Sequence, residues 1–391
     1  MNVGRVAGRT GFAFALLLLG LVLATARAET RLESPGFGNI DELRMSHMYP
    51  ALDTLVVGDA VVPGLHENFV PQGIDFLDEH PGEVVLSGYF CKRFSRFPQS
   101  FVPRCVQKRS ALYLVDATAG RALRLALLSE RDGTPMRRHA GGVASLYGHL
   151  WLPDNFVIFR FDLNALRDAE EPVITMTPDN DRPIAVDASG DFISAFEDSL
   201  WVGNFQRADR GRPLPPHYLS PLSGTAGWTA GYRMDPQTLR PVSRERYEVS
   251  FAGQRYEVLR PDAALHHRNK AQGMGFIDAR NVVLSASYGP SNSRLSFHAL
   301  ECDPFRAEEC GIPVTLPDDS TLHVQALAEQ SLSTALAAPP GAEGVAFDGE
   351  RLTVVFEGGA MPYRRRWWLV EDRLLLFLPP PESSAPPLRA R

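Results

Sequence analysis

The sequence predicts an all-β fold, a β-propeller of five or six four-stranded blades closed by an N-terminal strand. Three observations predict it: a short unit repeats along the chain, strand-like runs joined by turns follow each copy, and one further strand-like run precedes the first copy. A β-sandwich, or a set of unrelated hairpins, is the alternative interpretation of the same runs.

The repeated unit consists of a polar or small residue, a glycine, an apolar residue and a small one, followed by a β-rich run. Its copies begin at Gln72, Gly141, Ile193, Gln272 and Glu343. The third copy is weaker and has Ala195 where the others have glycine. Inner strands of a propeller converge, so a side chain at the glycine would obstruct the next blade. A degenerate sixth unit could lie in 206–260 or 311–342.

The run from Asp53 to Val62 has no partner of its own in the repeat. We expect it to supply the outer strand of the last blade, because this pairing would remove an exposed sheet edge.

The two ends of the chain differ in composition from the middle. Residues 1–28 have a basic start, an apolar run and an Ala26-Arg27-Ala28 site, which together are typical of a cleaved signal peptide. A membrane anchor is the alternative, but the apolar run is shorter than the roughly 20 residues that a span needs. We interpret 29–48 as a leader that need not be ordered, 49–378 as a single propeller domain, and 379–391 as a disordered Pro-rich tail. The protein is expected to be secreted or periplasmic.

Four cysteines fit such an oxidising compartment. Of the three possible connectivities, the local one is preferred, with Cys91 paired to Cys105 and Cys302 paired to Cys310.

The formal net charge of −6 argues against a nucleic-acid partner, which would require a basic footprint. No later apolar run is long enough to span a membrane, and we expect a monomer. The sequence contains no G-x-S-x-G elbow, no H-E-x-x-H pair and no Walker loop.

The units around Gln272, Glu343 and His139 resemble the inner strands of the gluconolactonase/regucalcin and strictosidine-synthase-like propellers, the calcium-dependent phosphotriesterase superfamily. The resemblance covers most of 66–378 as a repeat pattern. It implies a divalent cation, most often calcium, in the central channel. Glu343 fits the family's Glu-Gly ligand position, and Gln72 and Gln272 stand where the family more often has Asn or Asp. Gly141 and Ser194 supply no carboxylate, so this ring offers one carboxylate and two amides.

Loops and inner strand ends converge at the mouth of a propeller channel, which makes the mouth the expected site. The candidate catalytic residues are His139 and Glu343, and the candidate metal ligands are Glu343, Gln72 and Gln272. Asp154, Asn204 and Glu357 end the second strands of their units and are candidate binding residues at the mouth. Each of these could instead satisfy strand ends and channel water. Two functions follow: a divalent-metal-dependent hydrolase of lactones or esters, or a non-catalytic propeller that binds a protein, glycan or small ligand.

Overall fold

The computed structural model describes residues 42–77, 80–94, 105–207, 213–367 and 369–381. The chain divides into two compact units, Met1–Phe37 and Gly38–Arg391, and every described residue belongs to the second. The predicted signal peptide and most of the leader and tail therefore lie outside the described residues.

The described strands form five sheets of four or more strands, mainly antiparallel, and one separate hairpin. The first sheet contains β2 (Phe69–Phe76), β3 (Glu83–Phe94), β4 (Cys105–Asp116), β5 (Arg121–Leu128) and β9 (Val173–Met176). The second contains β6 (Ala144–Leu146), β7 (His149–Asp154), β8 (Val157–Asp162) and β10 (Ile184–Ala185). The third contains β11 (Phe192–Phe196), β12 (Ser199–Gly203), β13 (Gly227–Asp235), β17 (Ala263–His267), β22 (Thr321–Ala326) and β21 (Ile312–Thr315), with β14 (Arg240–Pro241) paired to β13.

The fourth sheet contains β18 (Ala271–Phe276), β19 (Asn281–Ala286), β20 (Ser293–Ala299) and β23 (Leu332–Ala338). The fifth contains β24 (Ala342–Phe347), β25 (Leu352–Phe356), β26 (Arg373–Phe377) and β1 (Val56–Val61). The hairpin is β15 (Arg246–Phe251) with β16 (Gln254–Leu259), and the short helices are α2 (Glu42–Met48), α3 (Pro50–Asp53), α4 (Leu163–Arg167) and α5 (Met361–Arg364). No helix in the described segments is long and apolar enough to cross a membrane.

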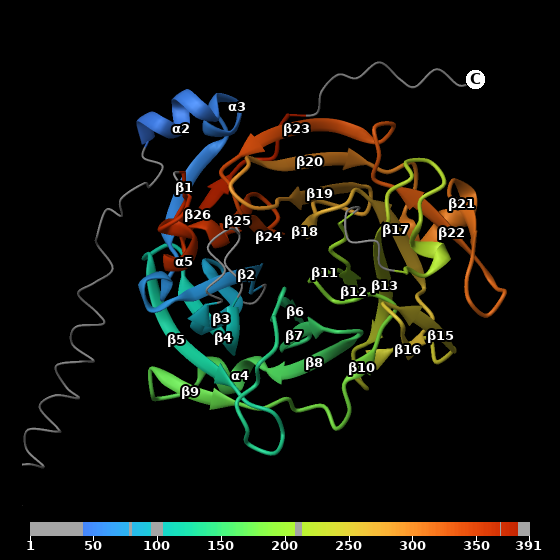
Figure 1. Cartoon of the computed structure of the whole chain (residues 1–391), viewed down its shortest axis with the longest axis horizontal. Helices are drawn as coiled ribbons and strands as arrows, with labels where there is room; N and C mark the ends of the chain where they lie inside the picture. The colour runs from blue at the N-terminus through green and yellow to red at the C-terminus, as the bar shows by residue number, and fades with distance from the viewer. Residues whose placement is uncertain (1–41, 78–79, 95–104, 208–212, 368, 382–391) are drawn as a thin grey trace, which may run out of the picture. The chain divides into compact units, whose positions relative to one another are not determined.

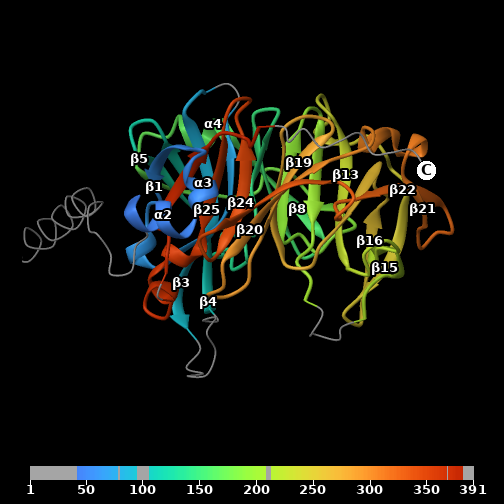
Figure 2. The same cartoon turned by 90° about the horizontal axis from the view of Figure 1, so that it is seen from above.

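The innermost strands of the sheets meet around a common centre (Figure 1). β2 contacts β24, β24 contacts β18, β18 contacts β11, β11 contacts β6, and β6 contacts β2. Figure 2 shows the same sheets from the side. Each inner strand therefore lies between two others, which is the propeller arrangement that the repeat predicted.

The expectation of five or six four-stranded blades is not confirmed, either in the number of blades or in the number of strands in each. The first sheet gains β9, which pairs in parallel with β5, and the third gains β22, which pairs in parallel with β17. In the second sheet β6 has three residues and β10 only two. The structure thus confirms an all-β propeller arrangement but not the expected regular set of blades.

Alternating residues of β26 pack into two different cores, which explains how a sheet is held between neighbours. Leu374 and Leu376 join the cluster that contains Ile74 of the first sheet. Leu375 and Phe377 join the cluster that contains Leu295 of the fourth sheet. Because successive side chains of a strand point to opposite faces, both faces of this sheet are covered.

β1 pairs antiparallel with β26, as expected for the segment from Asp53 to Val62, although Asp53 itself ends α3. An ion pair of 2.6 Å between Arg373 Nη1 and Asp59 Oδ1 accompanies the ladder. The two ends of the described chain therefore share one sheet.

Both predicted disulfides, Cys91–Cys105 and Cys302–Cys310, are present. Cys91 and Cys105 belong to the paired strands β3 and β4, so the first bridge joins the two arms of one hairpin. The described residues contain no free cysteine.

Candidate functional site

Glycines fix which residues are equivalent at the centre of the propeller. A Cβ on Gly73 would lie 2.5 Å from the Cα of Gly142, and one on Gly344 would lie 2.7 Å from the Cα of Gly73. Such distances exclude a side chain, so these strands approach one another as only glycine permits. A Cβ on Gly142 would lie 3.1 Å from the Cα of Phe192, which makes Phe192 the counterpart of the glycines in the third sheet.

The residue before each of these positions defines what we call the inner ring. Its members are Gln72, Gly141, Asp191, Gln272 and Glu343. The sequence reasoning missed Asp191 and placed Ser194 here instead. The predicted position is displaced by three residues. Phe192 stands where the other inner strands have glycine, whereas the sequence analysis had taken Ala195 as the counterpart of the glycine. The inner ring consequently holds two carboxylates, not one.

Strand register defines a second set of equivalent positions, which we call the outer ring. Ile74 pairs with Leu86 and Val345 pairs with Val354, and the outer-ring residue follows three positions later on the second strand. Likewise, Ile193 pairs with Val202 on β12, and Met274 pairs with Leu284 on β19. Three positions further on lie Phe205 and Ser287. The outer ring contains Tyr89, Phe205, Ser287 and Glu357. The inner and outer rings together form what we call the mouth.

Glu343 is a buried acid of the inner ring, 2% exposed. The Gln272 amide donates from Nε2 to its Oε1 over 2.8 Å. Burial raises the pKa of Glu343 well above its usual range, and the nearby charges of Glu357 and Asp191 raise it further. The structure therefore brings Glu343 and Gln272 together, and burial favours the protonated form of Glu343.

Glu357 is the buried acid of the outer ring. Gln72 Nε2 donates to its Oε2 over 3.4 Å, and the Tyr363 hydroxyl on α5 also donates to it. Burial raises the pKa of Glu357 to about 7, although these two hydrogen bonds and the charge of Lys108 act in the opposite direction. A carboxyl with this pKa exchanges protons near neutrality.

Tyr363 connects Glu357 to the rest of the mouth. Its hydroxyl also hydrogen-bonds with Tyr89, and burial raises the pKa of both phenols. The ammonium of Lys108 lies 4.1 Å from the centre of the Tyr89 ring, and the ring of His139 lies 5.5 Å from it. Nothing in the repeat signals Tyr363, because it comes from a helix inserted between β25 and β26.

His139 and Asp154 line a cavity of about 530 Å³ next to Tyr89. His139 is an exposed residue, and Lys108 lines the same cavity. Desolvation of the imidazole lowers the pKa of His139 well below its usual range, and the charge of Lys108 lowers it further. The imidazole is therefore neutral at pH 7. Asp154 accepts from the backbone NH of His139 over 3.2 Å and forms an ion pair of 3.1 Å with Arg138. The structure thus joins these two predicted residues.

Asn204 is fully buried and bonds to the backbone of its own sheet. Its Oδ1 accepts from Trp228 N over 2.8 Å, and its Nδ2 donates to Ala226 O over 3.4 Å. Asn204 lies one position before the outer-ring residue Phe205, and a shift of one residue turns a side chain to the opposite face of a sheet. This register separates it from Glu357, with which the sequence analysis had grouped it.

Glu343, Gln72 and Gln272, as placed, do not fit a hard cation. Both amides direct their Nε2 donors toward carboxylates, whereas such a cation takes oxygen ligands. Among the described residues, no group of three or more His, Cys, Asp or Glu side chains is placed to hold a metal ion.

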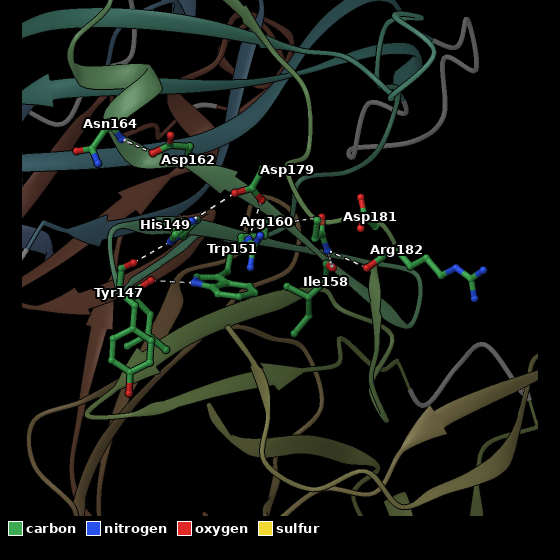
Figure 3. A network of polar contacts seen from close by, with 12 residues as sticks. Tyr147, His149, Trp151, Ile158, Arg160, Asp162, Asn164, Asp179, Asp181 and Arg182 are labelled. Carbon is green, nitrogen blue, oxygen red and sulfur yellow. Dashed lines mark hydrogen bonds and ion pairs between the residues drawn. The ribbon is translucent and has the colours of Figure 1, made fainter. Parts of the chain in front are cut away.

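Two polar clusters outside the mouth are networks of a different kind. Asp187, completely buried, accepts from Tyr218, Tyr247 and His217 over 3.0, 2.7 and 2.8 Å. Between β9 and β10, Asp179 contacts His149 and Arg160 of the second sheet at 3.3 and 2.7 Å (Figure 3). Both carboxylates face cationic or donor groups, which distinguishes them from the acids of the mouth.

Comparisons with known proteins leave the function open. No family model matches the chain, and no curated protein does. The resemblance to the gluconolactonase/regucalcin propellers is therefore not confirmed. The chain is similar in structure to a glutaminyl cyclase from Myxococcus xanthus, with 9% identity, 83% of this chain and 96% of that chain covered, and a TM-score of 0.37. It is also similar in structure to BamB from Moraxella catarrhalis, with 10% identity, 79% of this chain and 85% of that chain covered, and a TM-score of 0.29. Likenesses at this level carry no argument about activity.

Proposed function

We propose that this protein binds a small ligand at the mouth, where Glu343 and Glu357 form an acid–base pair. The observation that carries the proposal is the pair itself: two buried carboxyls, close enough for one charge to raise the pKa of the other. Burying two acids together costs stability, so a fold rarely retains such a pair for structural reasons alone. Perturbed buried acids are characteristic of functional sites.

The pair is held in place by neutral groups. Gln272 and Gln72 each donate to one carboxyl, and Tyr363 donates to Glu357. These contacts fix the orientation of both acids without neutralising them. The acids therefore keep lone pairs available for a ligand.

The substitutions Glu343→Gln and Glu357→Gln test this proposal. Glutamine has nearly the same shape and can still accept from Gln272, so we expect Glu343→Gln to raise the melting temperature by a few degrees while abolishing ligand binding. Binding is measured by thermal shift with a panel of small amines, carboxylic acids and sugars. Glu371→Gln is the control, because Glu371 is a buried acid outside both rings. If both mouth variants lose stability and bind every compound as the parent protein does, the pair is structural and the proposal fails.

Hydrolysis of esters or lactones at the same mouth is the second candidate, and the pKa of Glu357, about 7, favours it. A general base works best when its pKa lies near the operating pH. His139, neutral beside the cavity, is the other candidate base. Turnover of p-nitrophenyl acetate and of γ-butyrolactone that disappears in Glu357→Gln would support hydrolysis, and rates equal to background would refute it.

A divalent cation, most often calcium in the family that the repeat resembles, stays a prediction within this second candidate. Calcium or manganese that binds only the native state raises the melting temperature with concentration. No shift at millimolar metal, in the parent protein and in Glu343→Gln alike, would remove the metal-dependent mechanism. We also propose that β1 closes the propeller and that the protein is exported.

A further inference from the structure

The cavity next to Tyr89 lies between the start of β4 and the segment that leads into the second sheet. Its volume of about 530 Å³ falls within the range of small-molecule pockets. Hydrogen bonds at Ser110 of β4 tie its two walls together. The Ser110 backbone NH donates to Met136 O over 2.9 Å, and its hydroxyl donates to Arg138 O over 3.1 Å. The cavity is therefore built into the fold, with residues of both walls lining one hollow.

Three cationic and two acidic residues line this cavity, and one of the cations engages both acids. Arg138 forms ion pairs of 3.1 Å with Glu130 and 3.1 Å with Asp154. The other two cationic residues are Lys108 and Arg137. The lining therefore carries one more positive than negative charge, and both of its acids are paired to Arg138.

The ammonium of Lys108 is placed by the ring of Tyr89. Its Nζ lies 4.1 Å from the ring centre, a cation–π contact, and the His139 ring lies 5.5 Å from the same centre. Desolvation and then the charge of Lys108 lower the pKa of His139, in agreement with this arrangement. An ammonium and a neutral imidazole thus contact one aromatic ring, and both residues line the cavity.

We propose that this cavity is an anion site for the carboxylate of a small organic molecule, with Lys108 as the cation that binds it and His139 beside it. The inference goes beyond the proposed function, because no residue of the acid pair and neither of its glutamine partners lines the cavity. A carboxylate supplies the one negative charge that balances the lining, and its oxygens accept from an ammonium and from an imidazole N–H. An amine would add positive charge to the lining, and a neutral compound would leave the excess uncompensated.

The test is an NMR titration of the full chain at neutral pH with three compounds of similar shape and different charge: lactate, lactamide and 1-amino-2-propanol. We expect lactate to bind and to shift the ring resonances of His139, which are assigned by their loss in His139→Gln. Lactamide and 1-amino-2-propanol should leave these resonances unchanged. Sodium chloride and inorganic phosphate at the same concentrations are the controls, because added salt by itself screens charges.

Lys108→Met should weaken lactate binding about tenfold, because it removes a charged donor while keeping most of the length of the side chain. Lys108→Arg should retain most of the binding, since it keeps the charge. Lys270→Met is the matched control and should bind lactate as the parent protein does. The Lys270 ammonium also lies over a tyrosine ring, 5.2 Å from the centre of Tyr288, but Lys270 does not line the cavity.

Equal binding of lactamide or 1-amino-2-propanol, or tighter binding of phosphate or chloride than of lactate, would overturn the inference. So would lactate binding that is unchanged in Lys108→Met, or a titration with lactate that never shifts the His139 resonances. If Lys108→Met does not fold, the comparison of the three compounds on the parent protein decides. None of these outcomes bears on the acid pair, which its own glutamine variants test.

Discussion

The Gln72 amide donates to the Glu357 carboxyl over 3.4 Å, although the two residues are 285 positions apart in the chain. Gln72 belongs to the first sheet and Glu357 follows the second strand of the fifth. The acid that titrates near neutrality is thus held at the junction of the first and last sheets. Its properties depend on that junction being formed.

The stability of the protein should decrease as the pH rises through the range in which Glu357 ionises. Its pKa is about 7 in the folded protein against 4.5 for an ordinary glutamate, so the folded state binds the proton more tightly than the unfolded state. The contribution is complete below about pH 4.5 and is lost by about pH 7, on the order of 3 kcal/mol. Urea denaturation at a series of pH values measures it. Glu357→Gln should flatten this part of the profile, and an unchanged profile would contradict the assignment. Glu371, with a pKa of about 8, should add a similar loss at slightly higher pH.

Tyr363→Phe should raise the pKa of Glu357. The Tyr363 hydroxyl stabilises the ionised carboxyl by donating to it, and phenylalanine removes that donor while retaining the ring. The pH range over which the stability is lost should move upward, and the stability should fall by about 1 kcal/mol, both measured by urea denaturation. A structural role alone would lower stability without moving this pH dependence.

Gly73→Ala should be strongly destabilising because the new Cβ would lie 2.5 Å from the Cα of Gly142 and 2.7 Å from Val143 N. Both atoms belong to the backbone directly before the inner strand β6 and cannot move aside without moving that strand. We expect a loss of about 2–4 kcal/mol, measured by chemical denaturation. Gly58→Ala on β1 is the control, since its Cβ would meet only Leu376 Cδ1 at 4.0 Å. Equal losses in both variants would contradict the steric argument.

Asp187→Ala should cost stability but leave ligand binding intact, in contrast to Glu343→Gln. Removing the carboxylate leaves the hydroxyls of Tyr218 and Tyr247 and the ring of His217 without their shared acceptor in a fully buried site. Such a change costs about 3–5 kcal/mol. Thermal unfolding and binding of the compound panel, both measured on the same preparation, separate the two effects. A variant that remains stable but no longer binds would place Asp187 in the function instead.

The glycine repeat predicted the propeller arrangement because glycine is required wherever inner strands touch. The same signal failed in the third sheet, where Phe192 takes the place of glycine and displaced the predicted position from Asp191 to Ser194. Local sequence patterns also identified both disulfides, since each pair of cysteines is close in the chain.

The mouth could be predicted only in part. Gln272 and Glu343 occupy equivalent repeat positions, and the structure joins them over 2.8 Å. Asn204 was grouped with Glu357 because both end a second strand, but register separates them by one residue. Tyr363 could not be found from the repeat, because it reaches Glu357 from an inserted helix.

The ladder between β1 and β26 joins segments that leave the ribosome at very different times. The ion pair between Asp59 and Arg373 spans 314 positions, so the β1 edge waits for its partner until nearly the whole chain has been synthesised. Contacts this distant in sequence are slow to form, because a long loop must close before any of them is made. During that interval β1 lacks the other three strands of its sheet, and the incomplete protein is open to aggregation and to proteases.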